Sequence, residues 1–324
     1  MSNNPPVETI PLDSKASRSP MTAISFGDPT VLQVVNVVIN SATNSHTRRA
    51  YSTALFGFLR WYESEGKPGF GVATINAYKA YLVAINLSPS TINLKLSAIR
   101  KLSHELGEQG LLDPLNAAKI AQIKGFTPLN SRMASFLSRE QAQCLINSPD
   151  TLTLRGQRDR AILALMVGCG LNRSEISYLC YENIQQLQGR WAIVDLVGKG
   201  NRSRTVPMPP WAKVALDGWT NALEDCAIPP IPTQRIFRAI NKADKLAGER
   251  QATEKRKSDG FMSPQAIADV LITYTSELGY KNITTQAIRR TFAKLARKGG
   301  AEIDQIQLSL GHSNHKTTER FLGT

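Results

Sequence analysis

The spacing of hydrophobic residues predicts helices throughout residues 31–122. Apolar side chains recur every three or four residues in four consecutive segments: VLQVVNVVINSA, SHTRRAYSTALFGFLRWYESEG, TINAYKAYLVAI and SPSTINLKLSAIRKLSHELGEQG. The second segment opens with Ser45 as its expected N-terminal cap and ends at a glycine. No alternating pattern typical of a strand interrupts these segments, so we expect a compact domain of four or five helices.

The second part of the chain mixes helical spacing with one short β pattern. Residues 123–137 break the periodicity with glycine, proline, asparagine and serine. Helical spacing then resumes at SREQAQCLINS, where Ser138 followed by Gln141 indicates a capping box. Within residues 189–209 two alternating runs flank the turn GKGN, which predicts a hairpin. The segments that follow are helical again.

These patterns divide the chain into an arm, two domains and a linker. We expect a flexible arm over residues 1–30, a helical domain over 31–122, a linker over 123–137 and a larger domain over 138–324. A polar, charged stretch at 244–260 is expected to form a loop in the second domain. The predicted fold class is mainly α with a small antiparallel β-sheet.

The net charge indicates what kind of partner the chain binds. The 324 residues carry a formal charge of +13 at pH 7, which indicates a polyanionic partner, most often nucleic acid. An acidic membrane is the competing partner, but no long basic amphipathic helix or lipidation signal is present. The longest apolar run, residues 161–171, falls far short of the roughly 20 residues that span a bilayer. The N-terminus also lacks the apolar stretch of a signal peptide.

The cysteines indicate a reducing compartment. Cys144, Cys169, Cys180 and Cys226 lie far apart and form no CxxC pair. We therefore expect buried free thiols in a cytoplasmic protein, and no metal site.

Four short stretches of the second domain stand in a fixed order. They are GCGLNRSEISYL (168–179), LVGKGNRSRTVPMP (196–209), TTQAIRRTFA (284–293) and LGHSNHKTTERF (310–321). In these places the sequence resembles the tyrosine recombinases, the phage integrase family. That family carries a Gly-Leu-Arg-x-x-Glu turn, a hairpin lysine, His-x-x-Arg-Arg-Thr-Phe-Ala, Leu-Gly-His-x-x-x-x-Thr-Thr and a nucleophilic tyrosine. The helical first domain resembles the family's core-binding domain, so the resemblance covers nearly the whole chain.

The resemblance implies a particular reaction at DNA. In this family a tyrosine hydroxyl attacks a phosphodiester and leaves a 3′-phosphotyrosyl link and a free 5′-hydroxyl, without metal, ATP or another cofactor. Two arginines and a histidine or tryptophan stabilise the charge on the non-bridging oxygens. A lysine protonates the departing 5′-oxygen, and a second histidine assists proton transfer at the nucleophile.

Several positions of this sequence match the family's site residues. Lys199 matches the hairpin lysine. Arg289 matches the second of the two arginines that stabilise the phosphate charge (the clamp arginines), and His312 matches the histidine of the Leu-Gly-His motif. Glu175 matches the acidic residue, which is expected to support the site from behind. Arg290 is expected to support structure or to contact the DNA backbone. The alternatives are ordinary: an exposed turn lysine, a solvated helix arginine and a helix-capping histidine.

Three positions depart from the family pattern. The residue after the Gly-Leu pair is Asn172 instead of the first clamp arginine, and Arg173 is rotated by about 100° on a helix, so it cannot simply replace it. The histidine of the third motif is Gln286, which cannot exchange a proton near neutral pH. The nucleophile position is Phe321, and no tyrosine occurs after Tyr280. The resemblance therefore implies that this chain has lost strand cleavage.

Three functions remain open from the sequence. The first is a recombinase-fold protein that binds DNA at recombination sites and does not cleave. The second is an active recombinase that takes a tyrosine from elsewhere in the chain or from a partner subunit. The third is a basic DNA-binding regulator that is not a recombinase.

The resemblance also implies how DNA is held. The family's two domains form a clamp around double-stranded DNA, and its members commonly act as tetramers on two duplexes, here as homo- or hetero-oligomers with recombinase subunits. Helices within 45–62 and 88–107 are expected to face the major groove. The candidate contacts are Arg48, Arg49, Lys95, Arg100 and Lys101 in the first domain and Arg202, Arg204 and Arg290 in the second.

Overall fold

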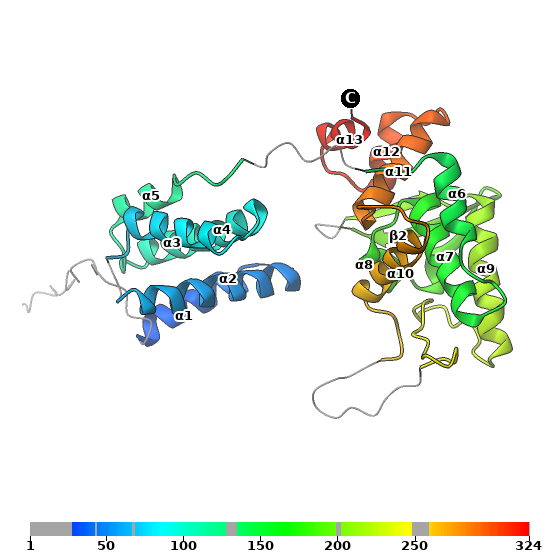
Figure 1. Cartoon of the computed structure of the whole chain (residues 1–324), viewed down its shortest axis with the longest axis horizontal. Helices are drawn as coiled ribbons and strands as arrows, with labels where there is room; N and C mark the ends of the chain where they lie inside the picture. Colours follow the sequence, from blue (N-terminus) through cyan, green and yellow to red (C-terminus); the bar gives the residue numbers. More distant parts are fainter. Residues whose placement is uncertain are drawn as a thin grey trace, which may run out of the picture. The chain divides into compact units, whose positions relative to one another are not determined.

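The computed structural model describes residues 28–42, 44–66, 69–127, 135–198, 202–247 and 259–323. The chain divides into two compact units, Met1–Ser131 and Arg132–Thr324, which are drawn in Figure 1. Almost all of the predicted arm and parts of the predicted linker and of the predicted loop at 244–260 lie outside the described residues.

Unit 1 is helical throughout its described residues, as the hydrophobic spacing predicts. Its helices are α1 (Pro29–Asn40), α2 (Ser45–Ser64), α3 (Val72–Ala84), α4 (Pro89–Glu108) and α5 (Pro114–Ala121). The cap of α2 was wrongly predicted: Asn44, not Ser45, precedes the helix, and its side-chain oxygen accepts a hydrogen bond from the backbone N–H of His46 at 2.7 Å. Ser88 caps α4 in the same way.

The core of unit 1 is a single hydrophobic cluster rich in aromatic rings. Phe58 on α2 contacts the rings of Trp61, Tyr62, Phe70 and Tyr78, with centroids 5.0 to 6.1 Å apart. The helix α4 packs against each of the other four helices. Edge-to-face and tilted rings of this kind bury a large apolar area in a fixed geometry.

Unit 2 combines helices with a small sheet. Its elements are α6 (Arg139–Asn147), α7 (Leu154–Cys169), α8 (Arg173–Tyr178), the 3-10 turn η1 (Tyr181–Asn183), β1 (Ile184–Leu187), β2 (Arg190–Val197), β3 (Ser203–Pro207), α9 (Pro210–Asp225), α10 (Pro264–Glu277), α11 (Thr285–Lys298), α12 (Ile303–Leu310) and α13 (His315–Leu322). The strands form an antiparallel sheet in the order β1-β2-β3. The predicted fold class is therefore confirmed, and β1 is a strand that the sequence did not reveal.

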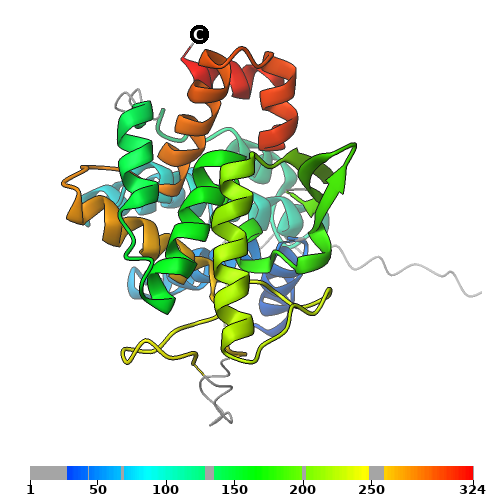
Figure 2. The same ribbon diagram turned by 90° about the vertical axis from the view of Figure 1, so that its right-hand side faces the viewer.

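The helix α7 lies at the centre of unit 2. Figure 2 shows α9, in yellow-green, alongside α7, in green, and the two helices pack closely. The residues of α7 from 161 to 167 are all buried, which explains the uninterrupted apolar run there. The predicted capping box at the start of α6 is confirmed, because Ser138 and Gln141 each accept from the other's backbone N–H.

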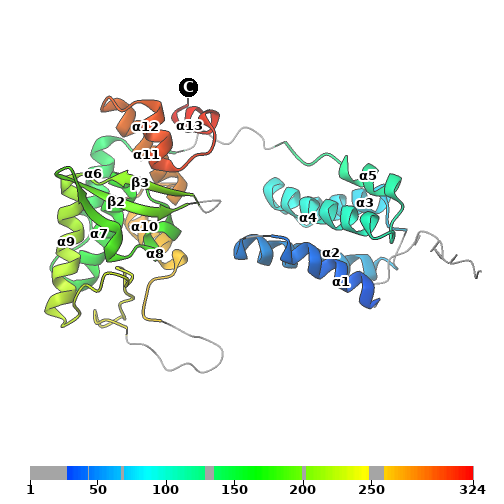
Figure 3. The same ribbon diagram turned by 180° about the vertical axis from the view of Figure 1, so that it is seen from behind.

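Two hydrophobic clusters meet along α11. The larger one fills the space among α6, α7, α9, α10 and the sheet, and it includes Ala287 and Ile288 of α11. The smaller one includes Ala293 of α11 and joins it to α12 and α13, which lie together at one end of unit 2 (Figure 3). Arg289 follows Ile288 and precedes Ala293 on α11, so it lies between the residues that this helix places in the two clusters.

The cysteines only partly follow the expectation. All four are free, but Cys144 and Cys226 are exposed and Cys180 is partly exposed, so only Cys169 is a buried thiol. No group of metal-ligating side chains gathers among the described residues. None of the helices in the described part of the chain is long and apolar enough to cross a membrane.

A buried arginine cluster as the candidate functional site

Arg289 is held at the C-terminal ends of two helices. Its side chain is 6% exposed, and its Nη1 and Nη2 donate to the carbonyl oxygens of Gly170 and Leu310 at 2.6 and 2.5 Å. These carbonyls end α7 and α12, where the helix dipole is negative. Burial lowers the pKa of Arg289, and nearby Glu175 opposes that shift. The guanidinium is thus fixed in position by two oriented carbonyls.

Two glycines of the sequence motifs allow this close packing. Gly170 and Gly311 follow α7 and α12 with φ angles of 62° and 67°, in the left-handed region that favours glycine. A Cβ on Gly170 would lie 2.5 Å from a ring carbon of Phe292, and one on Gly311 would lie 3.1 Å from Nη1 of Arg204. Glycine therefore suits both turns: it adopts the left-handed conformation without strain and leaves room for Phe292 at Gly170 and for Arg204 at Gly311.

Glu175 joins two guanidinium groups. Its side chain is 5% exposed, its Oε1 accepts from Nη1 of Arg204 at 2.9 Å, and its Oε2 lies 3.5 Å from Nη1 of Arg289. Oε2 also accepts from the backbone N–H of Asn172 at 2.9 Å. With two hydrogen-bond donors and a second guanidinium 3.5 Å away, this carboxylate offsets part of the positive charge around it.

Arg204 reaches this carboxylate from the sheet. Its Nε donates to the carbonyl oxygen of Ser309 at 2.9 Å, while its Nη2 is buried and has no hydrogen-bond partner among the described residues. The sequence indicated Arg204 only as a DNA contact. Its place in the cluster could have been found from the alternation of β3, because Arg204 and the fully buried Val206 share one face of the strand.

Asn172, which the sequence resemblance aligns with the first clamp arginine, serves as the N-terminal cap of α8. Its Oδ1 accepts from the backbone N–H groups of Ser174 and Glu175, both at 2.9 Å, and so begins α8. The neighbouring Arg173 is exposed and donates to Gln265 at 3.1 Å. Neither residue brings a guanidinium to Glu175.

His312 follows the Gly311 turn and is half-buried. Its Nδ1 lies 3.1 Å from the hydroxyl oxygen of Thr318 on α13. Burial, together with the positive charges of Arg289 and Arg204, lowers the pKa of His312 to about 4. The ring is therefore neutral at pH 7 and acts there as a hydrogen-bonding group without charge.

Phe321, which the sequence resemblance aligns with the nucleophile, lies on α13 with its ring held on two sides. The ring of His312 meets it edge to face, with centroids 4.8 Å apart. The guanidinium carbon of Arg290 lies 5.0 Å from the centroid of the same ring, as in a cation–π contact. The phenyl group is thus fixed beside the arginine cluster.

The structure brings some of the expected site residues together and leaves others apart. Arg289 and Arg204 meet at Glu175, and His312 is close enough to feel the charge of both arginines. Phe321 packs on His312, and Arg290 contacts the Phe321 ring. Gln286 is exposed in the first turn of α11. Lys199 lies outside the described residues.

The expected DNA contacts of unit 1 differ in exposure. Arg48 and Arg49 are exposed in the first turn of α2, whereas Lys95, Arg100 and Lys101 on α4 are partly buried. The Nη2 of Arg100 donates to the carbonyl oxygen of Ile123 in the same unit. Arg202, in unit 2, is exposed next to β3.

Two tyrosines of unit 2 have partners outside the arginine cluster. The hydroxyl of Tyr274 donates to Asp159 at 3.2 Å, beside the ion pair of Asp159 with Arg158. Tyr178 is exposed, and its ring lies under the guanidinium of Arg235. These contacts do not favour either residue as a replacement nucleophile.

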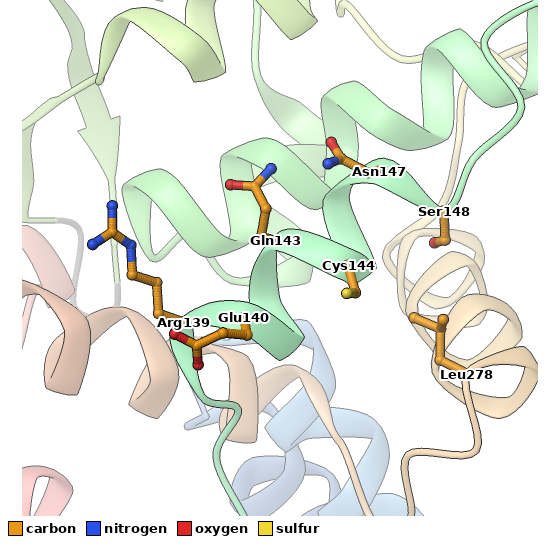
Figure 4. A pocket seen from close by; sticks show the side chains of 7 residues that line it. All are labelled: Arg139, Glu140, Gln143, Cys144, Asn147, Ser148 and Leu278. Carbon is orange, nitrogen blue, oxygen red and sulfur yellow. The ribbon is translucent and has the colours of Figure 1, made fainter.

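A surface pocket of about 790 Å³ lies elsewhere on unit 2, between α6 and the end of α10 (Figure 4). It is lined by Arg139, Glu140, Gln143, Cys144, Asn147, Ser148 and Leu278. None of the expected site residues lines it, so this pocket is separate from the arginine cluster.

Comparison with known proteins gives consistent relatives. Residues 135–323 match the model of the phage integrase family. Tyrosine recombinase XerC of Myxococcus xanthus is 29% identical over 282 residues, covering 86% of this chain and 87% of that protein. Tyrosine recombinase XerD of Shewanella oneidensis is 26% identical over 281 residues, covering 86% of each chain.

Solved structures share the fold at low sequence identity. The integrase of the Tn1549 transposon, in complex with circular intermediate DNA, matches with a TM-score of 0.64 and 14% identity, over 90% of this chain and 94% of that one. The XerH site-specific recombinase, bound to palindromic difH substrate, matches with a TM-score of 0.63 and 14% identity, over 94% of this chain and 87% of that one.

Proposed function

The chain belongs to the phage integrase family, the tyrosine recombinases, and from that premise we propose that it binds duplex DNA at recombination sites without cleaving it. The observation that carries this proposal is the ring of Phe321, held between His312 and Arg290 beside the arginine cluster. A phenyl ring fills the space of a tyrosine ring with little change in packing, but it has no oxygen with which to attack a phosphate. The family's helix is present and its covalent step is absent.

The remaining residues suit the binding of a phosphate. The buried guanidinium of Arg289 would stabilise charge on the non-bridging oxygens. His312 is neutral at pH 7, and its Nδ1 is engaged with the hydroxyl of Thr318. In the tautomer that carries its proton on Nε2, the ring can donate a hydrogen bond to a phosphate oxygen. Lys199 keeps the role of the hairpin lysine as a proposal, while Gln286 can donate a hydrogen bond but cannot exchange a proton.

The rest of the chain would supply the grip on DNA. Residues 31–122 would form the core-binding domain and 138–324 the second half of a clamp, with most affinity coming from arginine and lysine contacts to phosphates. The Tn1549 integrase and XerH share this fold and were solved with DNA, which supports the same partner here. The chain would act in the cytoplasm, in homo- or hetero-oligomers with recombinase subunits, as a tetramer on two duplexes.

The first test measures binding against salt. We expect the chain to select a site with inverted repeats from random-sequence duplexes, and to lose about 10³–10⁵ in affinity between roughly 50 and 200 mM salt. Equal affinity at both salt concentrations would contradict a grip on phosphates. Binding that ignores inverted repeats would favour a regulator that is not a recombinase.

The second test looks for a covalent product. A nicked suicide duplex carrying the selected site is incubated with the chain and resolved on a denaturing gel. We expect the DNA to migrate free of protein, although the same mixture shifts on a native gel. A covalent band would establish instead an active recombinase that takes a tyrosine from elsewhere in the chain or from a partner subunit.

A further inference from the structure

Arg204 has one buried donor group that nothing described satisfies. Its side chain is 9% exposed, and two of its nitrogens are engaged: Nε donates to Ser309 and Nη1 to Glu175. Nη2 is also buried, yet no hydrogen-bond partner for it is present among the described residues. Buried guanidinium N–H groups are seldom left unpaired in folded proteins, so such a group calls for an acceptor that arrives with a ligand.

The charges around Arg204 favour an anion as that ligand. Arg204 and Arg289 each carry a positive charge, and Glu175, with a negative charge, stands between them. His312 is neutral at pH 7, because burial and then the charges of Arg289 and Arg204 lower its pKa to about 4. One buried positive charge therefore remains uncompensated in the cluster, and a buried charge needs a partner.

We propose that Arg204 is the second phosphate-binding guanidinium of this site, its Nη2 donating to a non-bridging oxygen in place of the clamp arginine that Asn172 replaces. Assigning the anion as a DNA phosphate rests on the proposed function. Arg204 comes from a different element, β3, and not from the turn before α8. The site would then again contain two phosphate-binding arginines, Arg204 from β3 and Arg289 from α11.

The backbone around Arg204 fixes the direction of the guanidinium. A Cβ on Gly198 would lie 3.0 Å from its Nη1, and one on Gly311 would lie 3.1 Å from the same atom. With Glu175 and the Ser309 carbonyl holding two nitrogens, the fork has little freedom. A donor positioned in this way needs no rearrangement when an anion arrives, which is the arrangement that electrostatic stabilisation requires.

The test uses inorganic phosphate as the probe and the full chain as the protein. Thermal unfolding is followed in increasing phosphate at constant ionic strength, with chloride as the balancing anion, and an apparent dissociation constant is taken from the rise in Tm. We expect phosphate to raise the Tm of the unaltered chain. Arg204→Gln should weaken apparent phosphate binding at least about tenfold, because a charge-assisted donor is lost.

Two further variants separate binding from folding. Arg204→Lys keeps a positive charge near Glu175 but has no second fork nitrogen, so we expect it to unfold in chloride close to the Tm of the unaltered chain and still to lose the phosphate effect. Arg190→Gln removes an exposed arginine at the start of β2 and should keep the full phosphate effect.

The outcomes are distinct. Phosphate stabilisation that survives intact in Arg204→Lys or Arg204→Gln overturns the assignment, and so does an unaltered chain that shows none. DNA affinity of the unaltered chain is measured alongside. If the chain binds DNA but no phosphate effect depends on Arg204, only this inference fails. If the phosphate effect depends on Arg204 but no DNA is bound, the proposed function fails instead.

Discussion

Unit 1 and unit 2 treat their charged side chains in opposite ways. Among the described residues of unit 1 no charged side chain is buried, and its aromatic core around Phe58 closes without one. Unit 2 buries Arg289 and Glu175 and almost all of Arg204 among helix ends and strand β3. The charge of an exposed arginine such as Arg49 is screened by salt, whereas buried arginines held by several partners keep one orientation.

Under the proposed function, the two units would contribute to DNA binding in different ways. Unit 1 would contact phosphates through exposed cations, and one such cation can replace another with little loss of affinity. The cluster of unit 2 depends on each partner, because removing one leaves another buried charge without compensation. Substitutions in unit 2 should therefore have large and specific effects. Three sets of variants of unit 2 test this dependence on buried charge, in decreasing order of the expected change.

The largest expected effect is the return of strand cleavage. The triple variant Asn172→Arg, Gln286→His and Phe321→Tyr should give a covalent band with the suicide duplex, where the unaltered chain gives none. If Arg204 already supplies the second guanidinium, the double variant Gln286→His and Phe321→Tyr should cleave within about tenfold of the triple. Without that help it should be about 10²–10³ slower, the usual cost of one missing donor.

Two controls accompany these variants. Gln286→His alone keeps Phe321 and should give no band. The triple variant also loses the Asn172 cap of α8, so it should be less stable than the double by about 0.5–2 kcal/mol. A triple variant that binds the selected site but remains inert would mean that Phe321 is not at the nucleophile position.

A smaller but still large effect is expected from Glu175→Gln. It leaves the buried guanidiniums of Arg204 and Arg289 without their carboxylate, which should lower the free energy of unfolding by about 3–5 kcal/mol. Urea unfolding followed by tryptophan fluorescence measures this, since three of the four tryptophans lie in unit 2. A loss below about 1 kcal/mol would mean that the cluster does not depend on the carboxylate.

The matched control is Asp217→Asn on α9 of the same unit. Asp217 pairs with Lys213 at 2.5 Å, but its side chain is 47% exposed, so solvent screens the pair. Its replacement should cost no more than about 1 kcal/mol. The contrast between the two carboxylates isolates burial as the cause.

The sequence predicted much of the fold because local patterns determined it. The helices of both units, the Ser138 capping box and the β2–β3 hairpin follow from spacing and turn residues alone. Asn44 instead of Ser45 as the cap of α2 shows that boundaries are less certain than elements. The short strand β1 has three exposed residues out of four and so gives little hydrophobic pattern to detect.

The composition of the site was harder to predict, because it depends on contacts between distant residues. Arg204 lies 29 positions from Glu175, and Arg289 lies 119 positions from the Gly170 carbonyl that it contacts. The motifs could indicate Arg289, His312 and Glu175 through a family resemblance. They did not indicate Arg204. The alternation of β3 places Arg204 on the same face as the buried Val206, but its contact with Glu175 also depends on how β3 packs against α12.

The smallest expected effect concerns His312 and pH. In the folded chain its pKa is lowered to about 4 by burial and by Arg289 on α11 and Arg204 on β3, whereas an unfolded histidine titrates near 6.5. Between about pH 4 and 6.5 His312 is therefore mainly protonated in the unfolded chain and mainly neutral in the folded chain. The contribution of neutral His312 to the free energy of unfolding is complete above about pH 6.5 and is lost as the pH falls through about 4.

The substitution His312→Gln should remove this dependence, because a glutamine does not titrate. Thermal unfolding of both proteins between about pH 7.5 and 4 should show the Tm of the unaltered chain falling relative to that of the variant as the pH drops. Since the ring is only half-buried, the difference should be modest compared with that of Glu175→Gln. Parallel curves would mean that His312 does not lie against the two arginines in solution, and the comparison between an exposed and a buried use of charge would then not extend to the histidine.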